Sequence, residues 1–427
     1  MDKKLEISQN DLNSENDLDS NGDLKSGKNF FQVDIMKAWM IFLVILDHST
    51  THDFLVQFGS PLWERIAIPG FIIVMGFNLG ISFKEKGITT LKEAYSKEYF
   101  ILKMKRYIIP YIILYFIQTI IFLLVYYVFQ PDIIEVWPYD LEGLRFLGFT
   151  FLWGPGMWFI PALFGSILVF PLLYICFKNA PIATFIFCFL IEWFMHILSY
   201  NIYIDGWFFT KMFFTTHIFY LFSGIGMGLW ISEDHEILSM GNEISSMVTI
   251  IFWILLPISL LYLIIFAQYG FYQLYNFMYV IGLGWIGGDY HFLSFPYSAF
   301  LFLIVLKIFP KKLDNKFSKI IKKISRSTYH ILLFQILYFS IAYHFWFSLE
   351  NGFDSHPIDY LWYYPLNLLI TIPGGIIWQT IEFKFYKKIK ENKIYGIIYK
   401  ILLILAVGFY VFFLFSRYFF FIVYPIP

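Results

Sequence analysis

The sequence predicts an all-α, polytopic membrane protein: a helical bundle of about ten core transmembrane helices plus one C-terminal helix. Of the 427 residues, 59% are hydrophobic, 23% are aromatic and only 15% are charged, whereas soluble domains carry about a quarter charged residues. The mean hydropathy is +0.64. The apolar residues also fall into runs of about 20, the length that crosses a bilayer as a helix.

These runs define the expected elements in chain order. We predict helices at residues 31–51, 62–83, 107–129, 156–177, 181–200, 212–232, 247–268, 292–309, 327–348, 359–382 and 396–423. The remaining apolar stretch, 272–291, is rich in aromatic residues and glycine. It predicts a short, broken or re-entrant helix that protein rather than lipid surrounds.

The chain divides into one membrane domain and two flanking segments. Residues 1–30 are polar, lack the apolar core of a signal peptide and predict a disordered cytoplasmic tail. Residues 31–385 form the membrane domain, and 386–427 contribute an additional C-terminal transmembrane helix. Cys176 and Cys188 lie in or beside apolar segments and support neither a disulfide framework nor a metal site.

Basic residues predict the orientation in the membrane. Lysines and arginines gather in 84–106, 307–326 and 384–393, and such loops stay in the cytoplasm. Placing all three groups there gives a multi-pass protein of the cell membrane with a cytoplasmic N-terminus. The composition predicts the lipid bilayer as a partner. The formal net charge is +0, so the overall charge predicts neither a nucleic acid nor an acidic substrate as a partner.

The first predicted helix carries a stripe of ionisable residues. At about 100° per residue, Lys37 and His48 fall within roughly 20° of each other and lie about 16 Å apart along the axis. Asp34 shares the stripe. Asp47 lies off it, as a hydrogen-bonding partner of another helix or as the residue that orients an imidazole. Ionisable groups inside a membrane are costly and usually face a polar cavity or a partner helix, so this stripe is the best functional clue in the chain.

For other polar residues the sequence leaves two roles open. Trp158 either anchors its helix at the membrane interface or lines a substrate cavity. Glu382 either neutralises Lys384 or belongs to a substrate site. Glu192 and His196, four residues apart, predict a buried hydrogen-bonded pair rather than a metal site. The sequence shows no zinc-ligand spacing, no glycine loop for phosphate and no Ser/His/Asp elbow.

Six short motifs occur in one order along residues 31–385. They are Asp34 with Lys37 and His48; Pro69-Gly70-Phe71 with Met75-Gly76-Phe77; Lys105-Arg106 before Pro110-Tyr111; Gly156 to Ile160; Ser325 to Gln335; and Glu382 in Ile381-Glu382-Phe383. Together they resemble the membrane acyltransferase-3 superfamily, which includes polysaccharide O-acetyltransferases and the heparan glucosaminide N-acetyltransferase group. The chain departs from that pattern at Lys37, where arginine is frequent, and at Phe334 or Gln335, where the family has histidine.

The resemblance implies a function. It implies transfer of an acyl group, usually acetyl, from acetyl-CoA as donor substrate to a hydroxyl of an envelope glycan or lipid-linked sugar, with no bound cofactor. His48 then removes the acceptor proton or carries the acyl group itself. Lys37, held by Asp34, meets a phosphate or the donor carbonyl at the cytoplasmic mouth of the stripe. In the basic loop 84–106, Lys103 and Arg106 are the cations expected nearest to that mouth.

Two other functions fit the same residues. A transporter or flippase of a glycan or lipid precursor could use the stripe as a proton relay, although the chain shows no internal repeat of the kind common in transporters. A non-catalytic membrane scaffold would leave the ionisable stripe unexplained.

Overall fold

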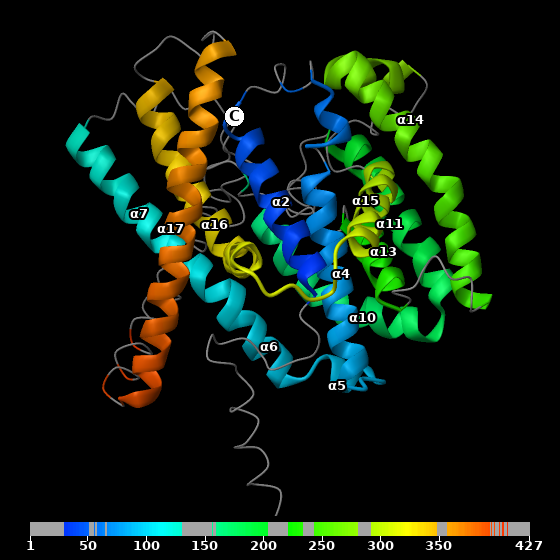
Figure 1. Ribbon diagram of the computed structural model, residues 1–427, viewed down its shortest axis with the longest axis horizontal. Helices are drawn as coiled ribbons and strands as arrows, with labels where there is room; N and C mark the ends of the chain where they lie inside the picture. Colours follow the sequence, from blue (N-terminus) through cyan, green and yellow to red (C-terminus); the bar gives the residue numbers. More distant parts are fainter. Residues whose placement is uncertain are drawn as a thin grey trace, which may run out of the picture.

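The computed structural model describes most of the membrane domain. The described residues are 30–50, 58–64, 66–129, 159–203, 221–233, 243–280, 292–347 and 357–392, with the single positions 55, 156, 394, 397, 401, 404 and 408. Throughout these residues the secondary structure is helical, without a strand, as Figure 1 shows. The predicted all-α fold is confirmed.

The described helices follow one another along the chain in a single order. They are α2 (Phe31–Asp47), α4 (Ala67–Glu85), α5 (Leu91–Ala94), α6 (Lys97–Lys103), α7 (Ile109–Phe129), α10 (Phe159–Asn179), α11 (Pro181–Tyr203), α13 (Phe222–Glu233), α14 (Glu243–Val280), α15 (Phe295–Ile308), α16 (Lys316–Phe347) and α17 (Pro357–Glu391). A π-helical turn, Met104–Ile108, joins α6 to α7. Short 3₁₀ turns at Ser60–Leu62 and Phe292–Ser294 precede α4 and α15.

Three of these helical stretches have the length and composition of membrane crossings. Within the described part of the chain they are Ser60–Glu85, Ala162–Asn179 and Met247–Gln268. The outer face of α14 exposes large apolar side chains, among them Ile250, Ile254 and Leu261. An apolar face of this kind suits contact with lipid.

α4 and α13 approach each other through small residues. A Cβ on Gly228 would lie 2.2 Å from the Ile73 carbonyl, and one on Gly76 would lie 2.8 Å from the Ile225 carbonyl. Membrane helices use small residues in this way to bring their backbones together.

At the start of α13 the backbone N–H of Ser223 donates a 2.9 Å hydrogen bond to the buried Glu192 of α11. The side chain of His196, its predicted partner, lies outside the described residues.

α2 lies between α4 and the α16–α17 pair (Figure 1). Contacts pair the start of α2 with Ser325 and its end with Gln335, so α2 and α16 run in the same direction. α17 returns antiparallel to α16, because Tyr338 bonds Asn367 and His330 bonds Glu382.

This topology brings the basic segments toward one end of the bundle, called the basic end below. The Phe31 N–H donates a 2.9 Å hydrogen bond to the Lys311 carbonyl. Gln379 of α17, before the third basic segment, donates one of 3.0 Å to the carbonyl of Arg326, the last residue of the second. Lys86 and Lys37 both act electrostatically on Lys103. The chain therefore gathers its separate basic groups at one surface.

Several helix boundaries differ from the prediction. α2 ends at Asp47 rather than at 51, where the hydroxyls of Ser49 and Thr50 bond back to the carbonyls of Ile45 and Leu46; serine and threonine compete with the helix in this way. α16 begins at Lys316, well before 327, because polar turns continue an apolar helix beyond the hydrocarbon. α17 likewise reaches Glu391.

The predicted separate element at 272–291 is wrong in its first half. α14 continues without a break from Glu243 to Val280, so glycine and aromatic richness did not interrupt the helix. Residues 281–291 lie outside the described part of the chain. So do residues 1–29 and all but isolated positions of the predicted helix 396–423.

Candidate active site

The ionisable stripe of α2 faces neighbouring helices. Asp34, Lys37, Asp47 and His48 are all half-buried, and the helix is regular up to Asp47. The partners of Asp34 and His48 come from α16. The stripe is therefore turned toward protein and remains partly accessible.

At the basic end, Asp34 is held by α16. The Ser325 hydroxyl donates a 2.7 Å hydrogen bond to Asp34 Oδ1. Lys37, followed by Arg326 and Lys322, exerts electrostatic attraction on this carboxylate. Asp34 thus connects the first helix to the cations of the second basic segment.

About 16 Å beyond Lys37 along the α2 axis, His48 is enclosed by other elements. The Gln335 amide of α16 contacts His48 Nδ1. Asp47 Oδ2 lies 3.8 Å from His48 Nε2, a distance for charge attraction rather than a hydrogen bond. The Phe339 ring stands edge-on at 6.1 Å between centroids. The side chain of His48 keeps 15% exposure.

Gly156 covers one edge of the imidazole. Its φ is +89°, a conformation that side-chain-bearing residues rarely adopt. A Cβ at this position would lie 3.4 Å from His48 Cε1 and 3.5 Å from Leu332 Cδ1. The positive φ is what favours glycine at this position, and an added Cβ would touch the ring at van der Waals distance.

Beside His48, a largely buried chain of hydrogen bonds joins three helical segments. Asn367 of α17 donates a 2.8 Å hydrogen bond to Ser49 Oγ and accepts one of 2.9 Å from the Tyr338 hydroxyl of α16. Ser49 directly follows His48. The network therefore fixes the residue next to the imidazole from two sides.

A cluster of cations lies at the basic end, where α6 meets α7. Lys103 Nζ lies 5.5 Å from the ring centroid of Tyr99 and 5.7 Å from that of Tyr107, and Arg106 Cζ lies 5.4 Å from the Tyr107 centroid. Burial, aided by repulsion from Arg106, Lys86 and Lys37, lowers the pKa of Lys103 to about 7. These four cations form the mouth cluster.

A π-helical turn shapes this cluster. Arg106 lies in the turn Met104–Ile108. Pro110 has no N–H to donate to the carbonyl four residues earlier, which is that of Arg106, so the α-helical pattern is interrupted there. Single π turns are frequent at functional sites, and this one leaves Arg106 exposed.

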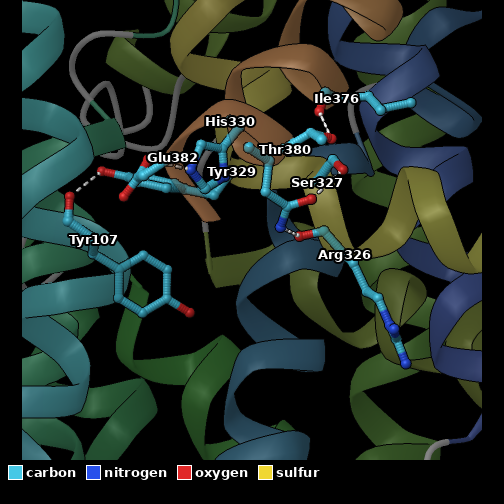
Figure 2. A network of polar contacts seen from close by, with 9 residues as sticks. Tyr107, Arg326, Ser327, Tyr329, His330, Ile376, Thr380 and Glu382 are labelled. Atoms are coloured by element: carbon cyan, nitrogen blue, oxygen red, sulfur yellow. Dashed lines mark hydrogen bonds and ion pairs between the residues drawn. The ribbon is translucent and has the colours of Figure 1, made fainter. Parts of the chain in front are cut away.

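Glu382 belongs to a second polar group beside the mouth cluster. Its Oε2 lies 2.9 Å from His330 Nε2, with each side chain 10% exposed. The neighbouring Tyr329 hydroxyl donates a 2.8 Å hydrogen bond to the Tyr107 carbonyl. Figure 2 shows Tyr107, Tyr329, His330 and Glu382 grouped together, with the Arg326 guanidinium directed away. The structure thus pairs Glu382 with His330 across α16 and α17.

Comparison with protein families shows which family the chain belongs to. Residues 30–380 match the model of a family described as an acyltransferase domain. The chain belongs to this acyltransferase family. The match begins at the residue before α2 and ends within α17. Comparisons with curated proteins and with solved structures find no match.

In the acyltransferase, most of the predicted site residues lie in two regions. Asp34, Lys37, Lys103 and Arg106 lie toward the basic end, while Asp47 and His48 lie at the far end of α2. Trp158 lies outside the described residues, although Gly156 of the same motif contacts His48. The sequence analysis did not single out Asn367, Tyr338 and Tyr329 as site residues. The feature that could have identified them is a polar group on an otherwise apolar helix. Among the described residues no three His, Cys, Asp or Glu side chains are arranged to hold a metal ion.

Proposed function

We propose that this acyltransferase is a multi-pass protein of the cell membrane that moves an acyl group, acetyl in the first instance, from acyl-CoA to a hydroxyl of an envelope glycan or lipid-linked sugar. The observation that carries the proposal is the position of His48. Its imidazole is enclosed by α16 and Gly156. It follows the same helix as Lys37, which acts electrostatically on Lys103 of the basic end.

The basic end suits the donor. Basic segments of membrane proteins stay in the cytoplasm, where acyl-CoA is found, and the N-terminus of α2 then lies on that side. The mouth cluster offers several cations to the phosphates of CoA, and the exposed guanidinium of Arg106 can bind phosphate oxygens through two parallel hydrogen bonds.

The length of the donor fits the spacing of the stripe. The pantetheine arm of CoA has 13 bonds between phosphorus and sulfur, and an extended chain advances about 1.2 Å per bond, so the arm spans about 16 Å. Lys37 and His48 are separated by about the same distance along α2. A donor with its diphosphate at the mouth cluster and its arm beside α2 would place the thioester next to the imidazole.

The transfer step then needs a base at His48. Nε2 takes the proton of the acceptor hydroxyl while the oxygen attacks the thioester carbonyl. The carbon–sulfur bond breaks, the thiolate of CoA takes the proton from the imidazolium, and the ester remains on the acceptor. The Asp47 carboxylate, 3.8 Å from Nε2, stabilises the positive ring that forms between the two proton transfers.

A covalent route uses the same nitrogen. Nε2 attacks the thioester, CoA leaves, and the acyl-imidazole passes its group to the hydroxyl. Incubating the purified protein with radiolabelled acetyl-CoA in the absence of an acceptor separates the two routes. Label that stays on the protein, and is absent from His48→Ala, indicates the covalent route.

The test of the function is acyl transfer by the purified full chain in lipid nanodiscs. His48→Ala should lose activity at least 100-fold, since general acid–base catalysis contributes roughly 10²- to 10⁴-fold. Lys37→Ala should also lose activity, through weaker binding of the donor phosphates. Lys319→Ala, an exposed lysine paired with Asp314, is the matched control and should keep full activity.

The acceptor is identified in cells. Envelope glycans and lipids from cells with and without the chain are compared by mass spectrometry for the mass increment of one acetyl group. Full transfer by the His48→Ala protein, or glycan movement across the membrane without any acyl-CoA, would overturn the proposal.

A further inference from the structure

Gln335 is the side chain that meets His48 Nδ1. It is fully buried on α16. Its amide nitrogen Nε2 lies against the ring nitrogen, and its amide oxygen Oε1 is buried without a hydrogen bond among the described residues. Glutamine does not titrate, so its contact survives changes in the charge of the imidazole. Phe339, one helical turn further along α16, stands edge-on to the same ring.

We propose that Gln335 is a positioning residue that makes Nε2 the reacting nitrogen of His48. In the reacting state its amide oxygen accepts a hydrogen bond from Nδ1–H, which leaves the lone pair on Nε2. This inference rests on the proposed function, because it assigns the geometry of the same imidazole.

The shape of an amide permits this arrangement. In the structure the amide nitrogen Nε2 faces His48 Nδ1. Turning the amide end for end brings Oε1, which is otherwise buried without a hydrogen bond among the described residues, to the same place, because the two ends of the group occupy nearly the same space. A neutral imidazole carries its proton on one nitrogen, and the hydrogen bond at that nitrogen decides which. With Nδ1–H bonded to Gln335, the base is Nε2, the nitrogen that lies nearest Asp47.

The same hydrogen bond persists through the reaction. When Nε2 takes a proton the ring becomes an imidazolium, whose Nδ1–H still donates to the amide oxygen. The ring therefore keeps its plane in both charge states. The buried Tyr338–Asn367–Ser49 hydrogen bonds hold the adjoining residues of α16 and α2 in register.

The experiment changes Gln335 in the full-length protein. Gln335→Leu removes the hydrogen bond at nearly constant volume, and Gln335→Glu replaces the amide with a carboxylate. The matched controls are Gln118→Leu and Gln118→Glu, because Gln118 is also fully buried and also bonds to α16, through the Ser340 hydroxyl at 3.2 Å. Size-exclusion profiles and thermal unfolding report whether each variant folds.

Kinetics give the first readout. Gln335→Leu should lower kcat about 10- to 100-fold, the range found when the hydrogen-bonding partner of a metal-bound histidine is removed, with the KM for acyl-CoA unchanged. In Gln335→Glu the negative charge favours the protonated ring, so the acidic limb of the pH profile of kcat/KM should move upward by about one pH unit or more. The Gln118 variants should keep the wild-type profile.

A second readout needs no turnover. The ¹⁵N resonances of the histidine ring, assigned by their loss in His48→Ala, should show Nδ1–H in the wild type and a mixture of tautomers in Gln335→Leu. Wild-type kcat in Gln335→Leu, or Nε2–H in the resting wild type, would overturn the inference. If no protein transfers an acyl group but the tautomers follow this pattern, the proposed function fails and the positioning role stands.

Discussion

The Ser325 hydroxyl donates a 2.7 Å hydrogen bond to the Asp34 carboxylate, which fastens the basic ends of α2 and α16 to each other. Ser325→Ala should lower the free energy of unfolding by about 1–3 kcal/mol, because a half-buried carboxylate loses a donor. It should also raise the KM for acyl-CoA, since Asp34 attracts Lys37. Ser298→Ala removes only an intrahelical hydrogen bond and is the control. Equal thermal unfolding of the two variants would contradict this expectation.

Lys103 should make donor binding depend on pH. Its pKa is lowered to about 7 by burial and by nearby cations, so raising the pH through 7 removes a positive charge from the mouth cluster. If the donor binds the protonated lysine, its KM should rise about tenfold between pH 6 and pH 8. Lys103→Arg keeps its charge over this range and should flatten the dependence. The same slope in both proteins would show that Lys103 takes no part in binding the donor.

The same group should affect stability in a defined direction. The pKa of Lys103 is lower in the folded protein than the usual 10.5, so between about pH 7 and 10.5 the unfolded chain binds more protons and stability rises with pH. Below pH 7 the folded state bears the full cost of the buried charge. Lys103→Met should therefore raise the thermal midpoint more at pH 6 than at pH 9. A midpoint shift independent of pH would be inconsistent with this account.

Gly156 offers a test of the imidazole pocket with an internal control. Gly156 and Gly87 both have positive φ, +89° and +65°, but an added Cβ would contact His48 only at Gly156 and would meet open space at Gly87. Both alanine variants should lose a similar stability, of the order of 1 kcal/mol. Only Gly156→Ala should also lose kcat, by about tenfold or more, as the ring shifts. Comparable kcat values in the two variants would rule out a role for this contact.

The His330–Glu382 pair should contribute mainly to stability. Each side chain is only 10% exposed, and removing one partner of a buried pair costs about 3–5 kcal/mol. Glu382→Ala should therefore lower the thermal midpoint strongly, whereas Glu391→Ala, an exposed partner of Lys387, should leave it unchanged. A large rise in donor KM at an unchanged midpoint would instead assign Glu382 to the substrate site, as its motif predicts.

The sequence predicted what depends on composition and on spacing within one helix. The all-α membrane fold followed from the apolar runs, and the shared face of Lys37 and His48 followed from helical periodicity. The neighbours of that face could not be predicted, because Ser325 and Gln335 lie almost 300 residues away and helical periodicity carries no information about which helices meet. Gln335 was visible only as a departure from a family motif.

Helix boundaries were predicted less well for a physical reason. Runs of apolar residues measure the part of a helix that lies in hydrocarbon, whereas hydrogen bonding decides where the helix ends. α16 therefore starts among lysines, and α14 passes through Gly270 without interruption. The end of α2 depends on the hydroxyls of Ser49 and Thr50, which bond back to helix carbonyls. Hydropathy contains no information about such local hydrogen bonds.

The parallel contact of α2 with α16 has a consequence for biosynthesis. The histidine is translated near the beginning of the chain, but its glutamine neighbour leaves the ribosome only after three quarters of the protein has been made. A nascent chain that stops before α16 therefore carries the imidazole without the helix that orients it. Contact between these two side chains is thereby deferred until most of the polypeptide has been made, so under the proposed function an incomplete chain would lack the oriented imidazole.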